Sequence, residues 1–385
     1  MIPPLAILPL LVALLLRADR APALRPVFHW LPLPVWCYAI PMALSTAGWL
    51  PAAHPLYPAI TGWALPLALG LLLLGVDLRS MAQTGARALA AAAAGAAGVM
   101  LGTAVGVHLL ARSLPPEAWR GAGALAGTWT GGTMNLLALR ALLDTPQSMF
   151  APLIMVDAII AYGWMAVLVA ASGAQPAVDR WLRAIPAAED AAAEPLPASE
   201  PNGRDARGAG WELWAAVLLI GALTAVTRVL GERLPRFAFV ASSAGWSVLL
   251  VTTAALAASL LAPLRHLAGG AARAGYPFLY LVLAATGAQA QAHALLAAPA
   301  WLLVGLIVVL IHAVVLLAAG RLLRLPLGIL ATASQANIGG VVSAPLVGAV
   351  YDRALAPVGL VLAMAGNALG TYLGLAAAAL CRWLT

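Results

Sequence analysis

Charged residues are scarce in this chain of 385 residues: they make up 9% of it, whereas soluble domains carry about 25%. Lysine does not occur, so all 21 basic residues are arginines. The only cysteines, Cys37 and Cys381, lie far apart in apolar stretches, which excludes a disulfide framework and a cysteine-based zinc site. Hydrophobic residues reach 63% and the mean hydropathy is +0.94, so the chain is predicted to be a polytopic membrane protein.

Enzyme signatures are also missing. The sequence contains no HExxH, GxSxG, P-loop or dinucleotide fingerprint, so we expect neither catalysis nor a bound cofactor, and no ATP-driven pumping by this chain alone. A net charge of +7 could indicate nucleic-acid binding. The arginines, however, are scattered between hydrophobic runs, which is typical of interfacial anchors and topology signals. We therefore expect the lipid bilayer and no nucleic acid as partner, in a bacterial inner membrane.

About twelve hydrophobic runs follow one another, and most reach the length of about 20 residues that crosses a bilayer. A polar stretch from Gln175 to Gly210 separates them into two groups, and it holds six of the fourteen acidic residues and several prolines. We interpret this stretch as a flexible linker. It would join an N-terminal transmembrane repeat, residues 1–174, to a C-terminal transmembrane repeat, residues 211–385. The predicted fold is thus all-α, with two structural repeats.

Each half contains a glycine pair inside a hydrophobic run, Gly131-Gly132 in the first and Gly339-Gly340 in the second. Uncharged polar residues surround both pairs, and this pattern predicts that the helix is interrupted there. Lipid offers backbone polar groups no partners, so unwound backbone persists only where it is buried in protein or lines a cavity. Two breaks in corresponding halves predict a transport site near the bilayer midplane, where two broken helices approach each other. The alternative is that the glycines only permit close helix packing.

The spacing of polar residues supports a repeat. Superposing the glycine pairs gives an offset of 208 residues, and Gly132 then precedes Asp157 by 25 residues while Gly340 precedes Asn367 by 27. The arginine distribution conflicts with strict alternation over twelve spans, which favours inverted repeats over parallel ones.

Asp157 is the strongest single candidate for a functional residue, because an ionisable side chain inside a membrane helix is energetically costly and by default indicates a function. It could carry a proton, or serve as an oxygen ligand for Na⁺. The alternative is a structural carboxyl hydrogen-bonded to a broken helix. We group Asn367 and His312 with it as ion-coupling residues, although a structural imidazole is the other interpretation of His312.

The predicted substrate site consists of the glycines of both breaks and the polar residues around them. Half-helix N-termini attract anions and half-helix C-termini attract cations, so one crossing could bind an anionic solute and its coupling cation together. A Na⁺ ion would lie near Asp157, Asn135 and Asn337, and no other metal site is predicted. Trp129 could stack on the substrate. The substrate-binding set is Thr128, Trp129, Thr130, Gly131, Gly132, Thr133, Asn135, Gln335, Asn337, Gly339 and Gly340.

Two further glycine series have a spacing of four residues, which lets helix backbones approach closely in lipid. We interpret both as packing features. They are Gly98, Gly102 and Gly106, and Gly366, Gly370 and Gly374.

These motifs, namely Trp129 to Asn135, Asp157, His312, Ala333 to Gly340 and Gly366 to Gly374, resemble the membrane family called domain of unknown function 819. That family is grouped with the cation:proton antiporters and the bile-acid-type sodium symporters. The resemblance covers nearly the whole chain. It implies a core domain with two crossed, broken helices, a separate panel domain, and ion-coupled or facilitated transport, without naming a substrate.

We therefore expect a secondary transporter of a small anionic or zwitterionic organic solute, coupled to Na⁺ or H⁺. One alternative is a monovalent cation:proton antiporter, although an antiporter would favour a carboxylate cluster and this chain offers Asp157 alone. Another is a membrane scaffold or sensor without transport, although a sensor would favour a folded soluble domain. The sequence leaves open the solute, the direction of transport and whether a homodimer forms.

Overall fold

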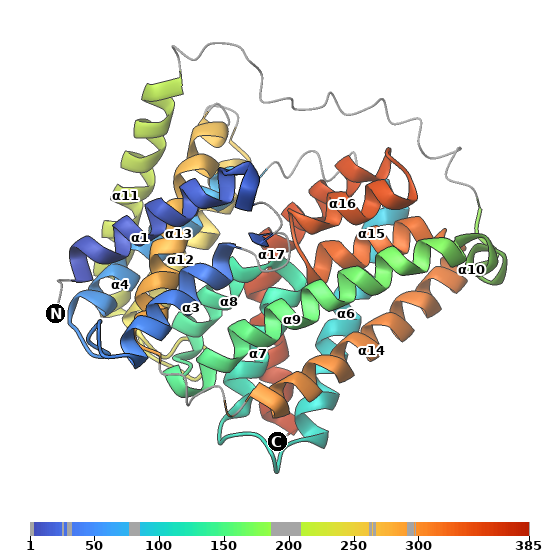
Figure 1. Cartoon of the computed structure of the whole chain (residues 1–385), viewed down its shortest axis with the longest axis horizontal. Coiled ribbons are helices and arrows are strands. Elements are labelled where there is room, and N and C mark those ends of the chain that lie inside the picture. The colour runs from blue at the N-terminus through green and yellow to red at the C-terminus, as the bar shows by residue number, and fades with distance from the viewer. Residues whose placement is uncertain are drawn as a thin grey trace. The chain divides into compact units, whose positions relative to one another are not determined.

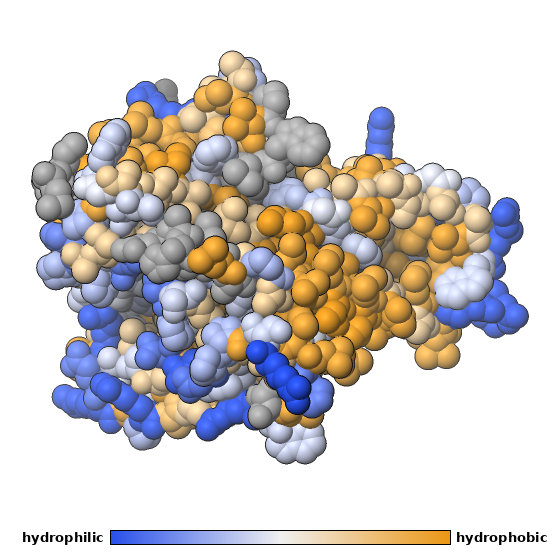
Figure 2. All heavy atoms as spheres, turned by 60° about the horizontal axis from the view of Figure 1, so that its bottom comes forward, coloured by the Kyte–Doolittle hydropathy of each residue, from blue (hydrophilic) through white to orange (hydrophobic). Residues whose placement is uncertain are grey.

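The computed structural model describes residues 4–24, 27–28, 33–76, 85–185, 209–261, 264, 267–290, 296 and 298–384 (Figure 1). These residues form helices and connecting turns, without a β-strand. Six of the described helices are long and apolar enough to cross a membrane. Apolar side chains gather over a broad area of the surface shown in Figure 2, as contact with lipid requires. The prediction of an all-α polytopic membrane protein is confirmed.

The chain folds into two compact units, and each takes segments from both halves of the sequence. Unit 1 comprises residues 1–75, 140–158 and 208–301, and unit 2 comprises residues 76–139, 159–207 and 302–385. This is a division by packing rather than by sequence order. That the two sequence halves are repeats stays a prediction.

Unit 1 is built around α13, which packs against α3 and α4, while α12 packs against α4 and α11. Small residues bring these helices together: a Cβ atom added to Gly70 of α4 would overlap the side chains of Ile220 and Val251. Ser242 caps α12 by accepting a hydrogen bond from the Gly245 N–H over 2.9 Å. The helices are α1 (Pro4–Arg20), α3 (Leu33–Thr46), α4 (Leu56–Leu74), α11 (Ala209–Arg233), α12 (Ser243–Ser259) and α13 (Ala268–Ala288).

Unit 2 is built around α17, which packs against α6, α7, α15 and α16. Two pairs of short helices, α7 with α8 and α15 with α16, follow one another closely in sequence, and they contain the glycine pairs. The division between the units falls within α8 and within α9 (Gln147–Ala171). The helices are α6 (Ala86–Leu109), α7 (Ala118–Gly131), α8 (Thr133–Leu143), α10 (Gln175–Leu182), α14 (Ala298–Leu323), α15 (Leu327–Ile338), α16 (Ser343–Tyr351) and α17 (Leu355–Leu384).

Both glycine series serve packing, as predicted. A Cβ atom on Gly102 of α6 would lie 2.7 Å from the Cα of Val308 on α14, and one on Gly370 of α17 would lie 2.8 Å from the Cα of Gly131 on α7. Real Cβ atoms do not approach that closely, so only glycine allows these backbone contacts.

The linker prediction is wrong for its first residues. Residues 175–182 form α10, which packs against α15 through the buried Leu182, and α11 begins at Ala209, just inside the predicted linker. The reason lies in Asp179, whose Oδ1 accepts a hydrogen bond from the Leu327 N–H over 2.7 Å. Leu327 begins α15, so this carboxylate satisfies a free helix N-terminus from a neighbouring helix. Residues 186–208 lie outside the described residues.

Removal of this cap has a measurable cost. Replacement of Asp179 by Ala leaves the Leu327 N–H without its partner and should lower the free energy of unfolding by about 0.5–2 kcal/mol. Glu232→Ala is the matched control, since Glu232 is exposed near the end of α11. Thermal unfolding of the two variants in the same detergent measures the difference. Equal melting temperatures would show that the Asp179 contact contributes nothing.

Candidate functional site

Both glycine pairs interrupt a helix. The first break separates α7, which ends at Gly131, from α8, which begins at Thr133, and Gly132 between them has φ +77° and ψ 170°. This backbone conformation is restricted almost entirely to glycine. The second break separates α15 from α16, and Gly340 has φ +84°. The prediction of two broken helices is confirmed, and the positive φ angles explain why glycine stands at both positions.

The two breaks meet within unit 2. A Cβ atom added to Gly340 would lie 4.0 Å from the Cα of Gly132. The two Cα atoms are therefore no more than about 5.5 Å apart, because a Cβ lies about 1.5 Å from its own Cα. This separation is smaller than the diameter of one helix, which is about 10–12 Å with its side chains. The breaks thus cross at their unwound residues, which places the N-termini of α8 and α16 near one another.

The first break is tied to α17 by Asn135. Its Nδ2 donates to the Gly131 carbonyl over 2.5 Å and to the Asn367 carbonyl over 3.3 Å. Its Oδ1 accepts from the Thr371 hydroxyl over 2.5 Å. Asn135 is fully buried, so these bonds supply partners to backbone that the break leaves free. The side chain of Asn367 also lies at the first break, because a Cβ atom added to Gly132 would lie 3.1 Å from the Asn367 Oδ1.

The second break is held by Gln335. Its backbone carbonyl accepts from the N–H groups of both Gly339 and Gly340, over 2.8 and 3.0 Å, and its Nε2 donates to the Ser343 hydroxyl over 2.9 Å. Gln335 is buried, yet its Oε1 has no hydrogen-bond partner among the described residues. A buried acceptor without a partner is costly, and it suits a water, an ion or a solute donor. Asn337 instead donates to the Ala92 carbonyl of α6, over 3.0 Å.

The predicted residues divide into a buried and a partly exposed group. Thr128 and Thr130 are fully buried, and the Thr130 hydroxyl donates to the carbonyl of Ala126 in its own helix. Trp129 is also fully buried, with its ring near Gly305 of α14, so here it packs in the core rather than offering a stacking surface. Partly exposed positions at the breaks are Gly132, Thr133, Gly339 and Asn367.

His312 stands in a closed hydrogen-bond chain inside unit 2. Its Nδ1 lies 2.8 Å from the Gly95 carbonyl, which can only accept, so Nδ1 carries the proton. Its Nε2 lies 2.8 Å from the Ser334 hydroxyl, which also accepts from the Trp164 indole N–H. Every polar atom of this chain is satisfied with a neutral imidazole. The geometry therefore favours the structural interpretation of His312 over the ion-coupling one.

Asp157 lies on α9, partly exposed, in the portion of that helix that belongs to unit 1. Both breaks belong to unit 2. Its predicted place at the crossing, and its predicted role in coupling, stay predictions. The described part of the chain holds no cluster of three His, Cys, Asp or Glu side chains suited to a metal ion.

Sequence reasoning missed Arg140. This residue lies on α8, and in unit 1 its guanidinium donates to the Thr286 hydroxyl over 2.9 Å and to the Gln147 side-chain carbonyl. Gln147 in turn donates to the Thr286 carbonyl over 2.9 Å, and the guanidinium stacks over Phe150. The signal was present, because an arginine inside a hydrophobic run is as unusual as Asp157 in the next one.

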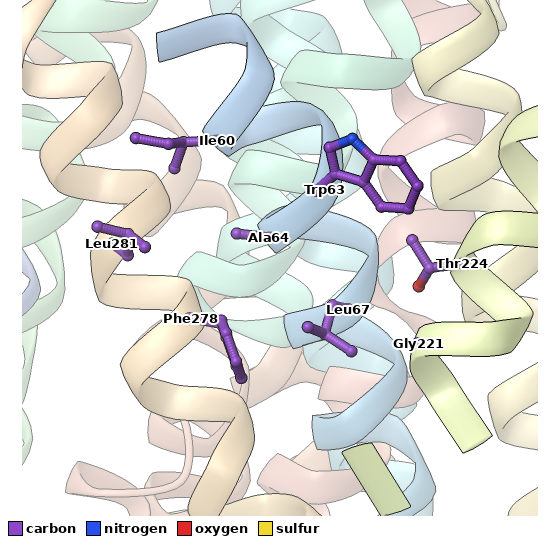
Figure 3. A pocket seen from close by; sticks show the side chains of 8 residues that line it. All are labelled: Ile60, Trp63, Ala64, Leu67, Gly221, Thr224, Phe278 and Leu281. Carbon is purple, nitrogen blue, oxygen red and sulfur yellow. The ribbon is translucent and has the colours of Figure 1, made fainter. Parts of the chain in front are cut away.

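A crevice of about 270 Å³ opens between α4, α11 and α13 in unit 1 (Figure 3). Trp63, Phe278 and Leu281 supply much of its lining, and Thr224 contributes its one hydroxyl. So apolar a lining suits lipid tails and does not suit a charged solute.

The fold and the site define a polytopic α-helical membrane protein whose two broken helices cross. The model of the family described as "Protein of unknown function (DUF819)" matches residues 6–384. The chain belongs to this family. It is also similar to the "Uncharacterized membrane protein YjcL" of Bacillus subtilis (strain 168), with 27% identity over 116 residues. That match spans 30% of this chain and 29% of the relative's length.

The backbone at Gly340 offers a direct test of the crossing. Gly340→Ala meets no atom closer than 4.0 Å, so its cost comes from the positive φ alone and should be about 1–2 kcal/mol of unfolding free energy. Gly163→Ala is the control, because Gly163 is an exposed residue within α9 with open space around it. That control should be neutral or stabilising by up to about 1 kcal/mol. If thermal unfolding in detergent ranked the two variants equally, the strained break would not exist.

Proposed function

We propose that this protein is a secondary transporter of a small organic anion or zwitterion, and that the crossing of its two broken helices is the binding site. The observation that carries the proposal is the approach of Gly132 and Gly340 to within about 5.5 Å. Close helix packing does not require unwound backbone surrounded by buried amide side chains. A solute-binding site uses such backbone, because unwinding frees backbone polar groups to bind a ligand at membrane depth.

Charge favours an anionic group on the solute. The N-termini of α8 and α16 lie at the crossing, and each presents partial positive charge and free N–H groups.

Oxygen acceptors favour a coupling cation at the same place. Gln335 offers a buried side-chain oxygen that lacks a partner among the described residues, and Asn367 offers its Oδ1 beside Gly132. Hard cations such as Na⁺ prefer oxygen ligands of this kind. In this proposal unit 2 is the core domain that holds the crossing, unit 1 is the panel domain, and Asp157 supplies the coupling carboxylate. The repeats would then be inverted, as in transporters built on broken helices.

A ligand screen tests the proposal. Purified protein is heated with organic anions, zwitterions or organic cations, with Na⁺ or K⁺ and at two pH values, and hits are followed by uptake into proteoliposomes. A solute at 100 times its dissociation constant should stabilise the native state by about 2.7 kcal/mol. We expect a carboxylate or a zwitterion to stabilise and to accumulate, and Gly340→Ala to abolish both effects.

Accumulation of organic cations alone would contradict the anionic solute. Exchange of Na⁺ or K⁺ for protons, without any solute, would show the antiporter instead. If a folded protein showed no stabilisation by any ligand and no transport, that result would favour the membrane scaffold.

Asp157 tests the coupling ion separately from the solute. Asp157→Asn keeps the shape of the side chain and removes its charge, so we expect a folded, inserted protein that still binds solute but no longer accumulates it against a gradient. Glu212→Gln, at the polar start of α11, is the control. Uptake with unchanged Na⁺ and pH dependence in Asp157→Asn would contradict the role of this carboxylate.

A further inference from the structure

A second pocket lies in unit 2, between α10 and the C-terminal end of α14. Figure 1 shows these two helix segments at its right-hand side. Its volume is about 760 Å³. Three arginines and a tryptophan line one side of it, namely Arg183, Arg321, Arg324 and Trp181. In Figure 2 hydrophilic side chains gather at the right-hand end, the end at which Figure 1 draws α10, beside apolar surface.

Hydrogen bonds to backbone carbonyls hold this pocket together. The Ile185 N–H donates to the Arg324 carbonyl over 3.0 Å, so the chain after α10 is bonded to the chain after α14. Arg87 of α6 then donates to the carbonyls of both Ile185 and Arg324, over 3.3 and 2.9 Å. These bonds connect α6, α10 and α14 at the pocket. Arg87, which does not line the pocket, already donates hydrogen bonds to the carbonyls that follow α10 and α14.

Two of the pocket arginines occupy strained backbone. Arg183 ends α10 and Arg324 follows α14, and both have φ +53°. Helices commonly end in this left-handed conformation with glycine, because any other side chain is disfavoured there. A cation one residue earlier would serve the helix dipole equally well without that cost. Both residues line the pocket, so this strained backbone supplies two of its three arginines.

Within the part of the chain that the structure describes, the guanidinium groups of the pocket remain available to a ligand. Among the described residues, no carboxylate forms an ion pair with Arg183, Arg321 or Arg324. Asp179, on the same helix as Trp181, is engaged by the Leu327 N–H. The Arg321 guanidinium lies 5.9 Å from the ring centroid of Trp181, which positions it without neutralising it.

The other side of the pocket is apolar and continues along the helix. Val314 and Leu322 of α14 line it and are 67% and 82% exposed, and Leu303 and Leu310 extend the exposed apolar face toward the start of α14. Trp181 is 55% exposed, as expected for an indole at a membrane interface. A cationic pocket that continues into an exposed apolar helix face complements an anionic phospholipid, which has a negatively charged headgroup and apolar acyl chains.

We propose that this pocket binds an anionic phospholipid, with its phosphate on Arg183, Arg321 and Arg324 and an acyl chain along the exposed face of α14. Guanidinium groups pair with phosphate oxygens in two-pronged fashion, and basic pockets between membrane helices suit such headgroups. A soluble anion would use the arginines but leave the apolar track without an occupant.

Native mass spectrometry of the full-length protein in detergent tests the proposal, with added phosphatidylglycerol, phosphatidylcholine or inorganic phosphate. We expect retention of phosphatidylglycerol in preference to phosphatidylcholine, and a loss of affinity of roughly tenfold or more in the triple variant R183Q/R321Q/R324Q. The matched control is R20Q/R112Q/R353Q, which removes the same charge from exposed arginines elsewhere and should keep the lipid.

A second variant separates binding from folding. R183G/R324G relieves the left-handed strain, so its lipid-free melting temperature should equal or exceed that of the unmodified chain while phosphatidylglycerol retention falls. Three outcomes would overturn the proposal: equal retention of both lipids, lipid retention that survives loss of the arginines, or displacement of the lipid by millimolar inorganic phosphate, which would show a soluble-anion site.

Discussion

The demand of every backbone N–H and C=O for a partner inside a lipid bilayer is the constraint on which this structure depends. Continuous helices meet it without help, and six of the described helices do so. The two broken helices meet it only because other parts of unit 2 supply the missing partners. Asn135 serves the Gly131 and Asn367 carbonyls, and the carbonyl of Gln335 accepts from both glycines of the second break.

Close packing makes those partners reachable. Asn135 of α8 reaches the Asn367 carbonyl and the Thr371 hydroxyl of α17 because α7 and α17 carry glycines at their contact, where Gly131 and Gly370 nearly touch. The glycine series between α6 and α14 has the same effect around His312, whose Nδ1 reaches the Gly95 carbonyl. Small residues, unwound backbone and buried amides are therefore parts of one arrangement, and the anion-attracting helix ends at the crossing follow from it.

The breaks and the packing glycines could be predicted from sequence, because Gly-Gly among buried polar residues and a spacing of four have local physical causes. The pairing of Asp179 with Leu327 could not, because it joins residues 148 positions apart and turns a polar stretch into part of a folded unit. The burial of Trp129 likewise depends on Gly305 of α14, far away in sequence. That Arg140 is an unusual residue could be predicted by the argument applied to Asp157. Its hydrogen bonds to Thr286 and Gln147 could not, because they depend on packing within unit 1.

The most direct measurement of the central claim is a disulfide between the two breaks. With Cys37 and Cys381 replaced by Ala, cysteines at positions 132 and 340 would have Cα atoms no more than about 5.5 Å apart, below the limit of about 7 Å beyond which a disulfide cannot form. Mild oxidation followed by peptide mass spectrometry should find an intramolecular 132–340 bridge that reductant removes and that neither single-cysteine variant forms. A folded protein in which these two cysteines stay free, or bridge only between molecules, would contradict the crossing of the broken helices.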